Sequence, residues 1–262
     1  MTQQEEFLFE RLPSGVGIAT LNRPERRNAL SPGITEGLAT MARELSRDRE
    51  TKVVILRGAG KAFCSGGDVG GFYGPRGERP AWRRPHPESN TASILRDMDQ
   101  PVIGAIHGYA VGAGFGLALS TDLRIAAEGT RFGVYQIRRG IVADGGLAYL
   151  LPKIVGNEKA FELMALGEDI DAQEALRLGL VSRVVPEDRL METAMEVAER
   201  IARGPSIAIS VAKRAMYHAE NHDLVANQEF IGFAQSHLFQ TEDAREGAKA
   251  FMEKRQPQFK GR

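Results

Sequence analysis

Cysteine is nearly absent from this chain of 262 residues, because Cys64 is the only one. No disulfide can therefore form within the chain, which suits a reducing compartment. A surplus of charge is absent as well, since 34 Lys and Arg residues balance 34 Asp and Glu residues. This balance argues against nucleic-acid binding through overall charge, although it leaves room for a local basic patch.

Long apolar runs are also missing. No stretch approaches the roughly 18 uninterrupted apolar residues of a membrane-spanning helix. The first ten residues, MTQQEEFLFE, are acidic and lack the basic start and apolar core of a signal peptide. We therefore expect a cytoplasmic protein, and the length fits one large domain or one domain with an appendage.

Strand-like and helix-like patterns alternate through about residue 155. Apolar runs at 7–11 and 16–21 flank a Pro-Ser-Gly turn and predict a hairpin. Residues 31–46 carry apolar side chains at helical spacing behind a Ser-Pro start. Continuously apolar runs predict buried strands at 52–58, 101–108 and 122–127. This alternation predicts an α/β fold with a parallel-rich sheet and crossover helices.

The pattern changes after Pro152, where helical spacing takes over. We expect the last third of the chain to be a helical appendage that does not continue the sheet. Residues 70–92, rich in glycine, proline and arginine, predict a long surface loop that is either a functional lid or a disordered segment. The segments expected to be helical are 158–167, 172–179, 187–203, 206–220, 223–239 and 243–254.

Two of the predicted strands are each followed by a turn of small residues. These turns lie at Ser65-Gly66-Gly67 and at Gly112-Ala113-Gly114. Such turns leave backbone N–H groups free, and two of these groups aimed at one point would stabilise a developing oxyanion. Tight turns or close helix–sheet packing are the alternative explanation of the same glycines. A dinucleotide fingerprint fails because Leu117 stands at its third glycine, and no P-loop motif occurs.

Longer motifs follow one another along essentially the whole chain. They are NRPERRNAL (22–30), GKAFCSGGDV (60–69), IHGYAVGAGFGLALSTDLRIAAEGTRFG (106–133), LPKIVGNEKAFELMALGEDIDAQEALRLGLVSRVVP (151–186) and TEDAREGAKAFMEKRQPQF (241–259). Together they resemble the enoyl-CoA hydratase/isomerase family, the crotonases. The resemblance implies a spiral core of repeated ββα units over residues 1–200. It also implies a C-terminal helical region, residues 201–262, that closes the active site and assembles a homotrimer or a dimer of trimers.

The same resemblance implies a CoA thioester substrate whose enolate is stabilised by the backbone N–H groups of Gly67 and Ala113. Coenzyme A is then part of the substrate, and no tightly bound cofactor is expected. No cluster of side chains has metal-ligand spacing, so no metal is expected either. The positions that match CoA contacts are Arg23 near the phosphates, Ala62, Ser65, Asp68 and Val69 around the adenine and pantetheine, and Lys254 from a neighbouring subunit. A solvated surface charge is the alternative for both cations.

The two glutamates that hydratases of this family carry are both missing. Gly116 and Gln136 stand at their positions, and neither side chain can exchange a proton near neutral pH. Asp144 matches an aspartate that acts as acid and base in the family's dienoyl-CoA isomerases and as nucleophile in its aromatic dehalogenases. A single well-placed carboxylate can remove a proton and return it. The alternative is that Asp144 only caps the helix predicted after Gly145-Gly146.

Three further side chains lie close to these motifs. His107 precedes the second turn and is expected to orient or pack. Tyr135 is expected to shape the acyl pocket. Cys64 occupies a position where small residues are common, so packing is favoured over a nucleophilic role.

The favoured hypothesis is double-bond isomerisation of an acyl-CoA with Asp144 as acid and base. Hydration of an enoyl-CoA, or hydrolysis, is the alternative within the same family. A second alternative is an oligomeric binding protein that kept the fold and lost the chemistry. Basic stretches at 83–87 and Arg138-Arg139 would then contact RNA or a protein partner.

Overall fold

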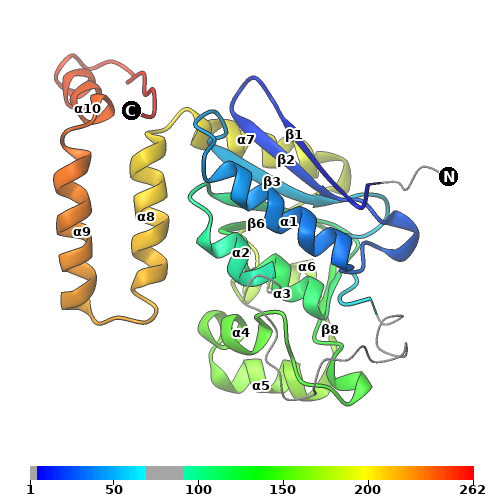
Figure 1. Cartoon of the computed structure of the whole chain (residues 1–262). Coiled ribbons are helices and arrows are strands. Elements are labelled where there is room, and N and C mark those ends of the chain that lie inside the picture. Colours follow the sequence, from blue (N-terminus) through cyan, green and yellow to red (C-terminus); the bar gives the residue numbers. More distant parts are fainter. Residues whose placement is uncertain (1–4, 69–90) are drawn as a thin grey trace, which may run out of the picture.

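The computed structural model describes residues 5–68 and 91–262 of the chain. Its main sheet has six strands, of which the first pair is antiparallel and the rest are parallel (Figure 1). In spatial order the strands are β1 (Phe7–Arg11), β2 (Val16–Leu21), β3 (Val53–Gly58), β4 (Val102–Ile106), β6 (Leu123–Ala127) and β9 (Arg183–Val185). The prediction of a parallel-rich sheet with an N-terminal hairpin is confirmed.

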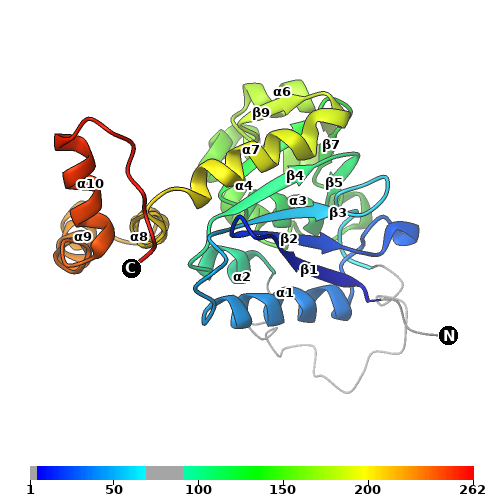
Figure 2. The same cartoon turned by 90° about the horizontal axis from the view of Figure 1, so that it is seen from above.

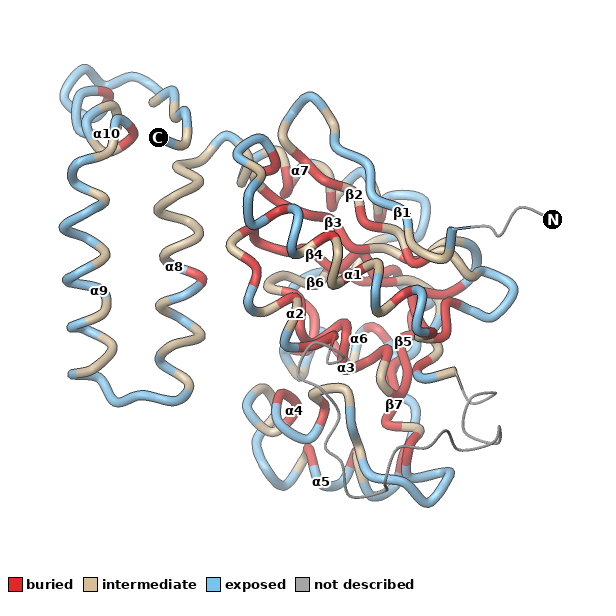
Figure 3. Tube along the Cα trace, viewed as in Figure 1, coloured by how far each residue is buried: buried red, intermediate tan, exposed pale blue. Residues whose placement is uncertain are grey.

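Helices cover both faces of this sheet, so its central strands are buried on both sides. Helix α1 (Pro32–Leu45) begins where the Ser31 hydroxyl accepts a hydrogen bond from the Ile34 N–H. Its apolar stripe packs on one face, while α7 (Leu190–Ala202) packs on the other (Figure 2). Figure 3 shows the buried residues concentrated along the strands between these two layers. The continuous apolar runs in β3 and β4 follow from this double coverage.

A second, three-stranded sheet lies beside the main one and carries the loops of the candidate site. It pairs β5 (Tyr109–Val111) with β7 (Arg131–Gly133) in parallel, and β7 with β8 (Asp169–Asp171) in antiparallel orientation. Isolated bridges continue this pairing from Cys64 to Ala110 and from Leu30 to Gly67. The remaining helices of the body are α2 (Thr91–Asp97), α3 (Ala113–Leu119), α4 (Leu147–Val155), α5 (Asn157–Leu166) and α6 (Ala172–Arg177).

The expectation that the sheet ends before Pro152 is wrong. Strand β9 pairs in parallel with β6, with Ile125 opposite Arg183, and so extends the main sheet by one strand. Strand β8 likewise joins the second sheet. Each of these strands has three residues, which is too short for an alternating pattern to stand out against the flanking helices.

Helices α8 (Ser206–His218), α9 (Leu224–Leu238) and α10 (Glu242–Met252) stand beside the body in both views (Figures 1 and 2). Helix α8 is tied to the body through Lys213, whose Nζ lies 2.9 Å from Asp122 Oδ2 and 3.0 Å from the carbonyl oxygens of Leu95 and Gln100. The Tyr217 hydroxyl donates to the other Asp122 oxygen. Burial lowers the pKa of the Lys213 ammonium, while the Asp122 charge opposes that shift.

Replacing Lys213 with methionine is expected to lower the free energy of unfolding by about 3–5 kcal/mol, because the change leaves the Asp122 carboxylate buried without its cation. Urea denaturation followed by circular dichroism measures the change. Lys249→Met is the control, since Lys249 is exposed on α10 and its loss is expected to change stability by less than about 0.5 kcal/mol. Equal unfolding midpoints for Lys213→Met and the unaltered chain would contradict this role.

No helix in the two described ranges has the length and apolar content needed to cross a lipid bilayer.

Candidate active site

Two turns of small residues meet in the structure although 47 positions separate Ser65 from Gly112 in the sequence. We call residues 65–67 the first turn and residues 112–114 the second turn. Gly66 has a φ of +97°, and a methyl group on it would lie 3.0 Å from the Val111 carbonyl oxygen and 3.4 Å from the Ala113 nitrogen. A short ladder aligns the two segments, because the Cys64 N–H donates to Tyr109 and the Val111 N–H donates to Cys64. Glycine at position 66 is thus required by this close approach.

Each turn presents a backbone donor without an acceptor. Within residues 5–68 and 91–262, neither the Gly67 N–H nor the Ala113 N–H donates a hydrogen bond. Ala113 is the first residue of α3, where the N–H has no partner inside the helix. The peptide groups on either side of Gly67 bond to Leu30, which directs the Gly67 N–H away from that strand. The turns therefore offer two free N–H groups on adjoining segments.

A third turn, residues 143–146 and called here the Asp144 turn, packs directly against the second turn. A methyl group on Gly145 would lie 3.0 Å from the Ala113 Cα. The Asp144 side chain is exposed, and its Oδ1 accepts a hydrogen bond of 2.9 Å from Gln136 Nε2. Gly146 is the N-cap of α4, and no side chain caps that helix. The interpretation of Asp144 as a helix cap is therefore wrong.

Gly116 explains how the Asp144 turn comes so close. A methyl group on Gly116 would overlap the Gly145 carbonyl oxygen, so any larger residue would displace the turn. The space beside Gly116, the position that the resemblance matches to a hydratase glutamate, is thus filled by the backbone of the Asp144 turn. The absence of a side chain at Gly116 therefore allows the turn that carries Asp144 to pack at this place.

Replacing Gly116 with glutamate is expected to lower the free energy of unfolding by about 1–3 kcal/mol, since the new side chain collides with the Gly145 carbonyl. We expect no gain of hydration activity, because the glutamate cannot enter without moving Asp144. Chemical denaturation and an enoyl-CoA hydration assay measure the two effects. Gly129→Glu is the matched control, since nothing lies within 4 Å of a methyl group at that position. A stable Gly116→Glu protein that hydrates enoyl-CoA would contradict the packing argument.

Gln136, at the second glutamate position, is buried with 4 % of its surface exposed. Its Nε2 holds Asp144, whereas its Oε1 is the one buried side-chain oxygen or nitrogen without a hydrogen-bond partner in the part of the chain that the structure describes. A methyl group on Gly112 would lie 3.8 Å from that Oε1. The carboxamide therefore lies between the second turn and the Asp144 carboxylate.

The predicted CoA contacts are gathered around the first turn, with two exceptions. The Arg23 guanidinium lies 3.0 Å from Glu6 and 2.9 Å from Asp68, so two carboxylates already compensate its charge. The Ala62 carbonyl accepts a hydrogen bond from Asn28 Nδ2.

Val69 lies outside the described residues. Lys254 comes two residues after the end of α10, which stands beside the body with α8 and α9 (Figure 1).

Two cations beside the first turn were missed from the sequence. The Ser65 hydroxyl donates to the Arg26 carbonyl and the Ser65 N–H donates to the Arg27 carbonyl, so both arginines adjoin the turn. Their side chains are exposed and form no ion pair with the described residues. Arg27 stacks over the Tyr109 ring at 5.7 Å. The adjacent arginines in NRPERRNAL (22–30) were the sequence signal that could have indicated these two cations.

The remaining side chains singled out from the sequence have structural contacts. Burial raises the pKa of the Cys64 thiol to about 12, which removes it as a nucleophile near neutral pH. A His107 ring nitrogen, Nε2, lies 2.9 Å from the Gly60 carbonyl oxygen, as an orienting role predicts. Burial and the neighbouring Asp169 carboxylate raise the pKa of Tyr135, whose hydroxyl donates to Asp169. Within the described ranges no group of acidic, histidine or cysteine side chains has the arrangement of a metal site.

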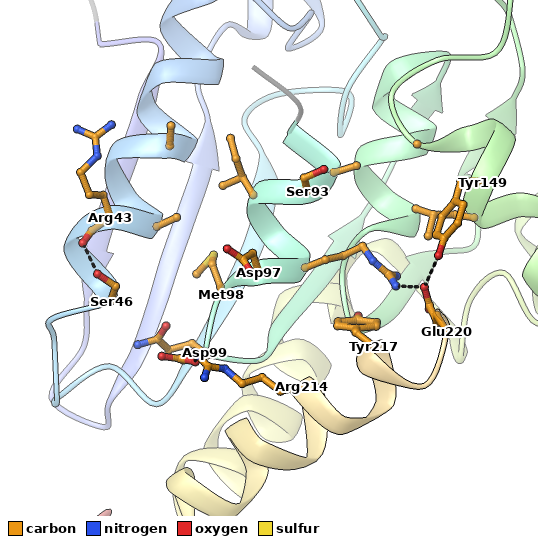
Figure 4. A pocket seen from close by; sticks show the side chains of 18 of the residues that line it. Arg43, Ser46, Ser93, Asp97, Met98, Asp99, Tyr149, Arg214, Tyr217 and Glu220 are labelled. Carbon is orange, nitrogen blue, oxygen red and sulfur yellow. Dashed lines mark hydrogen bonds and ion pairs between the residues drawn. The ribbon is translucent and has the colours of Figure 1, made fainter. Parts of the chain in front are cut away.

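A cleft of about 990 Å³ lies between α1, α2, α4 and α8 (Figure 4). Its wall carries a polar cluster in which Glu220 forms an ion pair with Arg96 and accepts a hydrogen bond from the Tyr149 hydroxyl. The Arg96 guanidinium also stacks on the Tyr217 ring, 3.7 Å from its centroid. Of its described lining residues, only Gly146 belongs to the Asp144 turn, and none belongs to the first or second turn. The cleft therefore adjoins the candidate site without containing its free N–H groups.

Comparisons with known proteins place the chain in one family. The sequence profile of the enoyl-CoA hydratase/isomerase family matches residues 11–262. The chain is 33 % identical over 260 residues to the 1,2-epoxyphenylacetyl-CoA isomerase of Escherichia coli K12, covering 98 % of this chain and 99 % of that protein. It is 36 % identical over 257 residues to the (E)-benzylidenesuccinyl-CoA hydratase of Thauera aromatica, covering 94 % and 96 % of the two chains. An enoyl-CoA hydratase structure from Geobacillus kaustophilus superposes with a TM-score of 0.90 at 32 % identity, over 98 % of each chain.

Proposed function

Because the chain belongs to the enoyl-CoA hydratase/isomerase family, the crotonases, we propose that it moves a double bond along the acyl chain of a CoA thioester. The family assignment makes it an acyl-CoA enzyme with a crotonase-like α/β fold. The position of the proton-transfer group is the basis for choosing isomerisation within that family.

In this proposal the thioester oxygen accepts hydrogen bonds from the Gly67 and Ala113 N–H groups. Neither group has another acceptor among residues 5–68 and 91–262, and the turns that carry them are in contact. Backbone donors fixed in advance stabilise the negative charge that forms on the oxygen when the thioester becomes an enolate. With the enolate stabilised in this way, a carboxylate of ordinary basicity can remove a proton from the acyl chain.

Asp144 supplies that carboxylate. It takes a proton from one carbon, the electron pair of the broken C–H bond enters the enolate, and the same carboxyl returns the proton to a second carbon. The observation that carries the proposal is the Asp144 turn packed on Ala113, with Gly116 and Gln136 at the positions of the hydratase glutamates. Asp144 is the only carboxylate within the three turns (residues 65–67, 112–114 and 143–146), and a single carboxylate suits proton shuttling better than the activation and protonation that hydration requires.

We further propose that the first turn binds CoA, through Arg23, Ala62, Ser65, Asp68 and Val69. CoA arrives with the substrate, so no tightly bound cofactor is invoked. Arg26 and Arg27 are added to this set because their backbone carbonyls accept hydrogen bonds from Ser65 and their exposed side chains form no ion pair with the described residues. Compensation of Arg23 by Glu6 and Asp68 makes these two arginines the stronger phosphate contacts.

Residues 201–262 are proposed to form the oligomer contact, as a homotrimer or a dimer of trimers around a core of residues 1–200. The support is apolar surface on α9 and α10 and on the turns after them: Phe233, Phe239 and Phe251 are 71 %, 69 % and 86 % exposed. Patches of this kind commonly mark protein contacts. Lys254, on the same region, would reach CoA in the neighbouring subunit.

Hydration is the second candidate, and the relative named (E)-benzylidenesuccinyl-CoA hydratase favours it. Incubation with 3-enoyl-, dienoyl- and aryl-CoA thioesters, followed by mass spectrometry, separates the two. Isomerisation leaves the mass unchanged, whereas hydration adds the mass of water. Products that carry only added water would overturn the isomerase proposal. Calorimetry that detects no binding of acetyl-CoA would favour a protein that has lost the chemistry.

A further inference from the structure

We propose that Gln136 is the positioning residue of Asp144, an inference that deepens the proposed function and rests on it. Its Nε2 fixes the Oδ1 oxygen of Asp144, and its Oε1 receives the carboxyl O–H while Asp144 holds the migrating proton. The side chain at the second glutamate position would thus support the proton shuttle without exchanging a proton itself.

The contact is specific in its orientation. Gln136 Nε2 donates to Asp144 Oδ1 at 2.9 Å. An ionised carboxylate only accepts hydrogen bonds, so the NH₂ side of the carboxamide must face it. The opposite orientation would set the Gln136 oxygen against a carboxylate oxygen. The ionised form of Asp144 therefore determines which way the carboxamide lies.

The other half of the carboxamide has no partner in this state. Gln136 is 4 % exposed, and its Oε1 is buried without a hydrogen bond in the described part of the chain. Native structures rarely leave such an acceptor unpaired, and an exception calls for an explanation. The explanation offered here is a hydrogen-bond donor that forms only at a later step of the reaction and then pairs with Oε1.

Proton transfer creates that donor. When a substrate C–H bond breaks, its electron pair enters the enolate and the proton forms an O–H bond on Asp144. A protonated carboxyl combines one O–H donor with acceptor capacity, and a carboxamide offers the complementary N–H and C=O groups side by side. Because Nε2 keeps Oδ1 as an acceptor, the proton is carried by Oδ2. A rotation of the carboxyl group then lets Oδ2–H donate to Gln136 Oε1.

The place of Gln136 suits this role. A methyl group on Gly112 would lie 3.8 Å from Oε1, so the waiting proton stays next to the turn that carries the Ala113 N–H. Donation to a buried acceptor also turns the O–H of the otherwise exposed Asp144 carboxyl away from solvent, which slows exchange of the proton before it returns. The proton moves to the second carbon when the enolate electron pair forms the new C–H bond, and Oε1 is then unpaired again.

The test uses Gln136→Met, Gln136→Glu and the control Gln173→Met, which makes the same change on the exposed surface of α6. Isomerisation of a 3-enoyl-CoA is followed in D₂O, and kcat, KM and the deuterium incorporated per turnover are measured. For Gln136→Met we expect kcat to fall about 10- to 100-fold, the effect of losing a hydrogen bond to a charged group. We expect KM to stay near that of the unaltered enzyme and deuterium incorporation to rise, while Gln173→Met matches the unaltered enzyme.

Gln136→Glu keeps the shape of the side chain and carries the test if Gln136→Met does not fold. Two carboxyl groups at hydrogen-bond distance cannot both ionise freely, so the acidic limb of the pH profile of kcat/KM is expected to move to higher pH. An unmoved limb would overturn the inference, as would unchanged kcat and deuterium incorporation in Gln136→Met. Either result leaves the proposed function standing if Asp144→Asn is inactive. Failure of the unaltered enzyme to isomerise any substrate would instead overturn the proposed function.

Discussion

Replacing Asp144 with asparagine is expected to lower kcat for double-bond isomerisation by about 10²- to 10⁴-fold, the usual contribution of a positioned acid and base. Asparagine has nearly the same shape but cannot take up a proton near neutral pH. The thioester binds through other groups in the proposed site, so KM is expected to change little. Steady-state kinetics with a 3-enoyl-CoA measures both constants.

The contacts of Asp144 make the expected result specific to proton transfer. Its carboxylate accepts a hydrogen bond from Gln136 and caps no helix, so the substitution removes no helix-capping interaction. Asp188→Asn is the matched control, since Asp188 is exposed in a short 3-10 helix remote in sequence from the turns. Full isomerase activity in Asp144→Asn would show that another group moves the proton.

Replacing Ala113 with proline is expected to lower kcat by about 10²- to 10³-fold, because proline deletes one of the two proposed oxyanion donors. Ala113 is the first residue of α3, a position at which helices accept proline readily. The preceding residue, Gly112, has φ +58° and ψ −133°, outside the α-helical region that a following proline disfavours. The fold is therefore expected to survive the substitution.

Ala113→Gly is the control for this experiment because it changes the side chain and keeps the N–H. Its kcat is expected to stay close to that of the unaltered enzyme. Circular dichroism and thermal melting establish that both variants are folded. A proline variant that turns over at the rate of the glycine variant would remove the Ala113 N–H from the mechanism.

Elements with a strong local pattern could be predicted from the sequence. Helix α1 has apolar residues at helical spacing behind a Ser-Pro start, and it forms within a residue of the expected bounds. Strands β3 and β4 are buried on both faces and carry the continuous apolar runs that this burial requires. Strand β9 was missed because three residues carry too little pattern, and pairing with β6 determines its conformation.

The candidate site also has parts that could be predicted from the sequence and parts that could not. Small residues after buried strands pointed to both turns, and the resemblance pointed to Asp144 as a candidate. What the sequence could not provide were contacts between distant segments. The fit of Gly145 against Gly116 depends on backbone positions in two loops, as does the hydrogen bond from Gln136 to Asp144. The ion pairs of Arg23 with Glu6 and Asp68 likewise depend on how segments distant in the sequence pack together.

The polarisation of a bound thioester tests the central claim most directly, because it reports on the N–H groups without requiring turnover. Acetyl-CoA labelled with ¹³C at the carbonyl is bound to the protein, and isotope-edited infrared difference spectra give its C=O stretching frequency. Two donors on the oxygen are expected to lower this frequency below its value in water, and Ala113→Pro is expected to reverse part of the shift. Calorimetry establishes that the ligand is bound in each case. A bound thioester whose carbonyl band stays at its position in water would contradict the account.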